Sequence, residues 1–277
     1  THQKHPRGNS LIKEYMLRDF KEPADFESFV YLSQILQAEG MRIGMEAHRR
    51  ARPYNMGTLY WQFNDCWPVA SWSSRDYYGN WKALQYTAKR SYEDLLISTV
   101  QSTDSISVYL INDKKENLDF DFLSEHIDYN GARMSSKAKF ISVNAASSKL
   151  IYTLATDDYL YIDSIENRSY LDIQVLQNGE VKARTLHHFV KTKEMDLPYT
   201  GISYKVEKDS LGFVLELFSD AFMKDVMISS LHDGRFEDNY FDLPANEHRR
   251  IRFFNDYPME EFNTSNLTFF SVVDTYE

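Results

Sequence analysis

The chain has 277 residues, of which 43% are hydrophobic and 26% are charged, a balance typical of globular proteins and unlike that of disordered ones. A formal net charge of −10 argues against nucleic acid as a partner, and no apolar run approaches the roughly 18 residues of a membrane span, so no membrane partner is expected either. The single cysteine, Cys66, excludes a disulfide within the chain and a thiolate metal cluster.

The start of the chain, THQKHPRGNS, is polar and has no initiator methionine, no capping residues and no hydrophobic period. We interpret it as a loop within a longer protein. The next segment, residues 25–52, predicts one long helix, because apolar and small side chains recur three and four positions apart and Pro53 follows. These side chains belong to Phe26, Phe29, Val30, Ser33, Leu36, Gly40, Ile43 and Ala47.

Residues 56–63, MGTLYWQF, are mostly apolar and bounded by turn signals, a pattern typical of a strand buried on both faces of a parallel sheet. A loop rich in Ser, Asp and Tyr follows, and a second amphipathic helix is predicted over residues 81–95. One strand between two helices cannot close a sheet, since both of its edges would stay unpaired. The pattern therefore predicts that the neighbouring strands lie before Thr1.

After Leu96 the hydrophobic period changes to two, which predicts a series of strands. The pairs Asn178-Gly179 and Asp233-Gly234 are residues that tight hairpins prefer, and the pattern restarts near Pro198. This spacing predicts two β-sandwich domains, at residues 96–197 and 198–277.

All four tryptophans of the chain lie between positions 61 and 81, interleaved with polar residues. The stretch 57–86, GTLYWQFNDCWPVASWSSRDYYGNWKALQY, resembles the sequence that follows the last barrel strand in β-mannosidases of glycoside hydrolase family 2. Residues 25–61 are similar to the helix and strand before it, and DGRFEDNYFDLPANE at 233–247 is similar to the end of the last sandwich domain in those enzymes.

The resemblance implies a multidomain fold. Residues 1–95 would be the last part of a (β/α)8 barrel, namely its seventh helix, eighth strand and eighth helix, and two immunoglobulin-like β-sandwich domains would follow. It also implies a retaining exo-β-mannosidase that hydrolyses terminal non-reducing β-D-mannosyl residues of a β-mannoside glycan without a cofactor. The family allows a homodimer and a periplasmic or lysosomal location. No metal is expected, and the adjacent His187 and His188 point to opposite faces of a predicted strand, so they cannot share one ion.

Barrel enzymes carry their active sites at the C-terminal ends of the strands, so the resemblance places the tryptophan stretch at the substrate. The implied substrate-binding residues are Trp61, Asn64, Asp65, Trp67 and Trp72. Trp61 would stack on the sugar, and Asn64 and Asp65 would hydrogen-bond sugar hydroxyls or the residues that hold the catalytic groups. The simpler alternatives are that Trp61 is a core residue and that Asp65 caps its loop or pairs with Arg75.

Retaining glycosidases use two carboxyl groups about 5 to 5.5 Å apart. In this family the acid/base glutamate follows the fourth strand and the nucleophile glutamate ends the seventh, and both lie upstream of the position that matches Thr1. No catalytic residue is therefore expected in this chain. We predict that it is inactive alone and that its first 95 residues are poorly ordered or self-associate.

Two alternatives to this function stay open. In the first, the chain is a β-sandwich module that binds carbohydrate or has a structural role. In the second, it is part of a family 2 glycosidase that acts on another sugar. The lack of tryptophan after Leu96 argues against a binding module, because glycan-binding faces usually present exposed indoles, but tyrosine can replace them.

Overall fold

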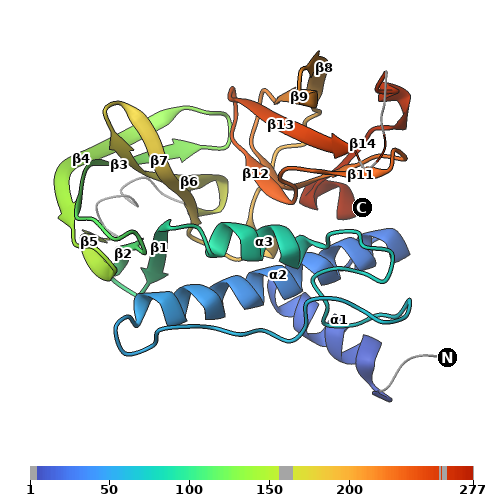
Figure 1. Cartoon of the computed structure of the whole chain (residues 1–277), viewed down its shortest axis with the longest axis horizontal. Coiled ribbons are helices and arrows are strands. Elements are labelled where there is room, and N and C mark those ends of the chain that lie inside the picture. The colour runs from blue at the N-terminus through green and yellow to red at the C-terminus, as the bar shows by residue number, and fades with distance from the viewer. Residues whose placement is uncertain (1–4, 156–164, 256, 258–260, 277) are drawn as a thin grey trace. The chain divides into compact units, whose positions relative to one another are not determined.

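The computed structural model describes residues 5–155, 165–255, 257 and 261–276 (Figure 1). The chain divides into two compact units. The first contains Thr1–Glu39, Tyr60–Thr87 and Leu197–Glu277, and the second contains Gly40–Leu59 and Ala88–Asp196. Among the helices that the structure describes, none combines the length and the apolar character of a transmembrane segment.

In the described residues, three α-helices precede the strands: α1 (Gly8–Asp19), α2 (Phe26–Arg50) and α3 (Ala83–Ser91). The prediction of one long helix after residue 25 is confirmed by α2, and Asp25 caps it by accepting a 2.8 Å hydrogen bond from the backbone N–H of Ser28. In contrast, α1 begins within the last three residues of the predicted loop at 1–10, and the sequence pattern predicts no helix for the rest of it. Its residues are mostly polar and only Met16 is fully buried, so its amphipathic pattern is weak.

Within the first unit, the helices share one hydrophobic core with the last β-strands. The hydroxyl of Tyr31 on α2 donates a 2.5 Å hydrogen bond to the backbone carbonyl of Asp225. The side-chain oxygen of Gln34 accepts from the backbone N–H of Ala83 at 3.2 Å and from the hydroxyl of Tyr240 at 3.4 Å. These bonds fasten α2 to both α3 and the last strands. The buried members of the core are Met16, Phe20, Tyr31, Leu32, Ile35, Ala38, Ala83, Tyr86, Tyr240 and Val272.

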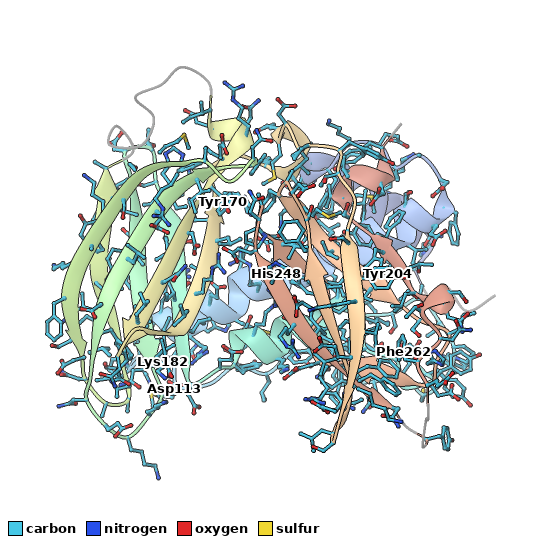
Figure 2. All side chains as sticks on the ribbon, turned by 90° about the horizontal axis from the view of Figure 1, so that it is seen from above. Asp113, Tyr170, Lys182, Tyr204, His248 and Phe262 are labelled. Atoms are coloured by element: carbon cyan, nitrogen blue, oxygen red, sulfur yellow. The ribbon has the colours of Figure 1, made fainter. Side chains whose placement is uncertain are left out.

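The last strands of the first unit form a β-sandwich of two antiparallel sheets, β11-β13-β9-β8 and β12-β10-β14 (Figure 1). Phe262 lies in its core, with its ring centre 5.5 Å from that of Phe213 (Figure 2). The strands are β8 (Ser203–Asp209), β9 (Gly212–Phe218), β10 (Met223–Ser229), β11 (Gly234–Phe236), β12 (Phe241–Leu243), β13 (His248–Asn255) and β14 (Thr268–Phe270).

The second unit contains another β-sandwich, with the antiparallel sheets β1-β2-β5 and β4-β3-β6-β7 (Figure 1). Both sheets contribute to its core, for example through Ile97, Val108, Phe122 and Ile173. The strands are β1 (Leu95–Gln101), β2 (Ser105–Asn112), β3 (Leu118–Asp128), β4 (Arg133–Val143), β5 (Ser147–Ala155), β6 (Ser169–Gln177) and β7 (Glu180–His188).

The two predicted hairpin turns have different outcomes. Asn178 and Gly179 both have positive φ and join the paired strands β6 and β7, so the first hairpin is confirmed. The prediction for Asp233-Gly234 is wrong, because β10 and β11 belong to different sheets. Gly234 instead begins β11, with φ at +145°.

In the second unit, the end of α2 is bound to the strands by charged side chains. The buried carboxylate of Glu46 accepts hydrogen bonds from the Arg42 guanidinium at 2.8 Å and from the Ser98 hydroxyl on β1 at 2.5 Å. Arg49 and Arg52 both pair with Asp113, which follows β2. This end of the helix therefore adds positive charge where the helix dipole is negative.

The expected buried strand at 56–63 is not formed, and the end of a barrel is not evident in the described residues. Leu59 is 99% exposed and Trp61 is 77% exposed. A strand of a parallel sheet needs a hydrogen-bonded neighbour on each side, and no described segment pairs with this one as a strand. The carbonyl groups of Gln62 and Phe63 instead accept from Ser74 and Arg75 at 3.0 and 2.9 Å.

Candidate functional site

The tryptophan loop, residues 60–82, belongs to the first unit and contains every residue predicted to bind a substrate. Its backbone folds back on itself twice. Arg75 pairs in a parallel bridge with Asn64 and in an antiparallel bridge with Trp81, and Lys82 donates a 3.0 Å backbone hydrogen bond to Ser74. The start, middle and end of the loop therefore lie side by side.

Asp65 is the centre of the polar contacts within this loop. Its side chain is 3% exposed. One carboxylate oxygen accepts from the Ser71 hydroxyl at 2.6 Å and the Gln62 amide at 3.3 Å. The other accepts from the Ser73 hydroxyl at 2.5 Å and lies 3.6 Å from the Lys82 ammonium.

The protonation of Asp65 follows from these contacts. Burial alone would raise the pKa of this carboxyl group, but hydrogen bonds from Ser71 and Ser73 and the positive charge of Lys82 outweigh it. The pKa of Asp65 is therefore lowered from its ordinary value of 3.8. The group is therefore a carboxylate at neutral pH. The alternative pairing of Asp65 with Arg75 is not observed: Arg75 instead donates to the backbone carbonyl of Gly79 at 3.1 Å.

The buried side chain of Ser74 also connects several parts of the loop. Its hydroxyl lies 3.0 Å from the backbone carbonyl of Phe63 and 2.7 Å from the side-chain oxygen of Gln85 on α3. Because the hydroxyl has one hydrogen, it donates to one of these two acceptors at a time. The Tyr60 hydroxyl lies 3.0 Å from it. These contacts tie the first residues of the loop to the helix that follows it.

Two residues outside the loop also hold it. The Gln37 amide on α2 donates a 2.8 Å hydrogen bond to the backbone carbonyl of Trp72. The guanidinium of Arg235 lies over the Trp81 ring, and Trp81 packs against Tyr86 of the shared core, with 5.1 Å between ring centres. Trp81 is thus a packing residue, as its position at the start of an amphipathic pattern predicts.

The other three indoles are exposed to different degrees: Trp61 by 77%, Trp72 by 64% and Trp67 by 42%. Asn64 is also exposed, and its amide donates to the backbone carbonyl of Asp65 at 3.2 Å. The structure thus brings the five predicted residues into one loop but divides them into four exposed groups and one buried carboxylate. Exposed indoles suit stacking on the C–H face of a sugar ring.

Sequence reasoning missed the partners of Asp65, namely Gln62, Ser71, Ser73 and Lys82. Trp72 lies at a bend between Ser71 and Ser73, so this run has no strand-like alternation that could identify the partners from sequence. Gln37 and Arg235 are distant in sequence, and no local pattern pointed to them.

A small cavity in the second unit lies outside these residues. Its volume is about 120 Å³, and it is lined by His48, Arg49, Arg52, Asn55, Met56, Gly57, Thr58, Tyr92 and Asp113. The charges of Arg49 and Arg52 are partly compensated by Asp113, so the cavity offers no strong anion site. Within the described residues, no group of three or more His, Cys, Asp or Glu side chains is arranged to hold a metal ion.

Sequence models of two domain families match the strand-rich part of the chain. One, described as a mannosidase Ig/CBM-like domain, matches residues 104–194. The other, an Ig-fold domain of mannosidases, matches residues 197–275. The two β-sandwiches are therefore immunoglobulin-like domains of mannosidase type.

Whole-chain comparisons extend the similarity to the helices and the tryptophan loop. The chain is 27% identical to a β-mannosidase of Capra hircus, over 97% of this chain and 33% of the relative, and 26% identical to β-mannosidase A of Aspergillus terreus, over 88% and 28%. The β-D-mannosidase structure of Dictyoglomus thermophilum matches 98% of this chain and 33% of that chain with a TM-score of 0.86 and 26% identity.

A more distant structure, the exo-chitosanase of Amycolatopsis orientalis, matches 95% of this chain and 36% of that chain, with a TM-score of 0.71. At 15% identity it shows a shared fold alone. The chain spans about a third of the length of the curated mammalian relatives it matches over nearly its whole length.

Proposed function

Because the chain belongs to the β-mannosidase family, we propose that it is the C-terminal portion of a retaining exo-β-mannosidase, which removes terminal non-reducing β-D-mannosyl residues from a β-mannoside glycan. The observation that carries this proposal is the match to β-mannosidases along nearly the whole chain, with a TM-score of 0.86 to one solved structure. The match includes the tryptophan loop as well as the two sandwiches, because it covers 98% of the chain.

In the proposed arrangement, residues 1–95 complete a (β/α)8 barrel, and residues 96–197 and 198–277 are its two following sandwich domains. Support comes from the apolar side chains of the segment expected as the eighth strand. Met56, Leu59, Trp61 and Phe63 are all more than half exposed, which is unusual for four large apolar groups so close together. In a complete barrel, neighbouring strands and helices would cover the apolar side chains of this segment that do not face the substrate.

The tryptophan loop is proposed as one wall of the sugar site. Trp61 stacks on the mannosyl ring, Trp67 and Trp72 line the pocket, and the exposed amide of Asn64 binds a hydroxyl. Both catalytic glutamates are proposed to lie outside this chain, so the chain alone is inactive. The carboxylates of the loop support this division, because Asp65 is buried among hydrogen-bond donors and Asp76 accepts two hydrogen bonds from Asn80.

Hydrolysis of p-nitrophenyl β-D-mannoside tests this function. We expect the intact protein to release nitrophenol and this chain alone to release none, with little activity of the intact protein on the β-glucosaminide, β-glucuronide and β-galactoside analogues. Preference for one of those sugars would overturn the proposed specificity. Hydrolysis by this chain alone would overturn the proposal that both catalytic groups lie elsewhere. Glycan binding without hydrolysis by the intact protein would favour a binding module.

A further inference from the structure

The carboxylate of Asp65 is already engaged by donors of its own loop. Its two oxygens accept three hydrogen bonds, from two serine hydroxyls and one amide, at 2.5 to 3.3 Å. The Lys82 ammonium lies 3.6 Å away as an ion-pair partner. The side chain is also 3% exposed, so a sugar hydroxyl would have to displace an existing donor to reach it.

The partners of Asp65 are sequence neighbours of the two most exposed indoles. Ser71 and Ser73 flank Trp72, and both of their hydroxyls turn toward Asp65. Trp72, between the two serines, is 64% exposed, so fixing both serines toward Asp65 leaves its indole on the outer side of the loop. Gln62 follows Trp61 directly in the chain, and its amide donates to Asp65 and to the backbone carbonyl of Asn64, the latter at 2.9 Å.

Lys82 closes the cluster from the far end of the loop. Its ammonium donates a 2.8 Å hydrogen bond to the Ser73 hydroxyl, which in turn donates to Asp65. The negative charge of Asp65 is thereby balanced by Lys82, and its lowered pKa keeps the cluster charged at neutral pH. Hydrogen bonds to an ionised carboxylate are stronger than those between neutral groups, so the contacts of Asp65 fix the geometry of the loop firmly.

We infer that Asp65 is a positioning residue, which holds Trp61 and Trp72 in the orientation that receives the sugar ring and does not bind the sugar itself. This inference rests on the proposed function for the identity of the ligand, but the arrangement of the loop does not depend on it. Asp65 acts through Ser71, Ser73 and Gln62, so removing those donors has the same effect as removing the carboxylate.

Near-ultraviolet circular dichroism in the tryptophan region tests the positioning directly, because all four indoles of the chain lie in this loop. The variants are D65N and the double variant S71A/S73A, and W61F/W72F shows how much of the signal these two indoles supply. We expect D65N and S71A/S73A each to lose most of that part of the signal while the far-ultraviolet spectrum stays unchanged. D76N is the matched control, since Asp76 is partly exposed in the same loop and the amide oxygen of that variant can still accept from the backbone N–H of Asn80.

The same variants in the intact protein test the link to the sugar. Because displacement of a binding group by about 1 Å can lower the rate about 10²-fold, we expect kcat/KM for p-nitrophenyl β-D-mannoside to fall about that much in both D65N and S71A/S73A, and D76N to keep the wild-type value. If D65N loses activity while its near-ultraviolet spectrum and the activity of S71A/S73A stay at wild-type level, Asp65 binds the sugar and the inference is wrong.

Failure of the proposed function gives a different result. In that case the wild-type intact protein does not hydrolyse the mannoside, while the spectra of D65N and S71A/S73A still change together. If D65N does not fold, the single variants S71A and S73A, which each remove one donor, provide the comparison. A wild-type spectrum in both single variants and in the double variant would overturn the inference.

Discussion

The guanidinium of Arg235, on β11, lies over the indole ring of Trp81 at the end of the tryptophan loop, with 5.1 Å between the guanidinium carbon and the ring centre. The same group lies 4.8 Å from the ring centre of Phe254 on the neighbouring strand β13. Arg235 therefore contacts two aromatic rings. The last sandwich of the first unit contacts the tryptophan loop through this side chain, which gives the sandwich a role in supporting the loop.

Replacing Arg235 by Ala should lower the free energy of unfolding of the first unit by about 1 kcal/mol, because an exposed cation–π contact contributes about 0.5 to 1 kcal/mol and the arginine also covers both rings. Urea unfolding followed by tryptophan fluorescence measures this free energy, since every tryptophan of the chain lies in the first unit. Arg235→Lys should lose less. Equal stability of wild type and R235A would show that the stacking does not stabilise the unit.

Gly234→Ala should be more damaging than its size suggests. Gly234 has φ at +145°, and an added Cβ would lie 2.3 Å from the carbonyl oxygen of Phe254. Backbone strain of this kind costs about 1 to 3 kcal/mol, and the clash adds to it. Gly201→Ala is the control, because nothing lies within 4 Å of its Cβ position and no positive φ is involved. Tryptophan-monitored unfolding should show a large loss for the first variant and almost none for the second.

The elements that the sequence predicts are those with a clean local pattern. The alternation of Ile106, Val108 and Leu110 marks β2, and the spacing of apolar residues marks α2, because each pattern matches the period of its element. The sequence pattern does not predict β3. Its buried residues include the charged and polar side chains Glu125 and His126, which interrupt the expected alternation.

The tryptophan loop shows where such prediction ends. The clustering of the indoles identifies the loop, but the buried state of Asp65 depends on where Ser71, Ser73 and Lys82 turn, and no local period encodes that. The segment 56–63 shows a different limit. Its apolar composition matches a buried strand, but a strand forms only where partners complete its ladder, and those partners are not local.

Acid should destabilise the second unit through two buried histidines. Burial lowers the pKa of His126 to about 4, and burial together with the charges of His188 and Arg42 lowers that of His187 to about 3, from an ordinary value of 6.5. The unfolded chain then binds more protons than the folded chain below pH 6.5. Their contribution to stability is complete above pH 6.5 and is lost toward the folded pKa values, by about 1.4 kcal/mol per pH unit for each histidine.

Hydrogen exchange of peptides from β3 and β7, measured between pH 7 and pH 5 and corrected for the intrinsic rates, should detect this loss. His126→Gln removes one titrating group and keeps a donor for the Ser169 hydroxyl, which lies 2.9 Å from the His126 ring nitrogen. The variant should therefore show a weaker dependence of protection on pH. An unchanged dependence would mean that His126 does not carry the acid sensitivity. His248→Gln, at an exposed position in the first unit, is the control.

Glu46→Gln should destabilise the end of α2 where it contacts β1. The carboxylate is buried and accepts from both Arg42 and Ser98, one on each oxygen, so glutamine, with one side-chain oxygen, leaves one of these two donors without its acceptor. An unmatched buried polar contact costs about 1 to 3 kcal/mol. Exposed Glu180, which pairs with Lys182 at 2.5 Å, is the matched control, and E180Q should leave stability almost unchanged because surface ion pairs contribute little. Hydrogen exchange of residues 40–50 and of β1 distinguishes the two variants: if E46Q leaves both segments as protected as E180Q does, Glu46 does not fasten the helix to the strand.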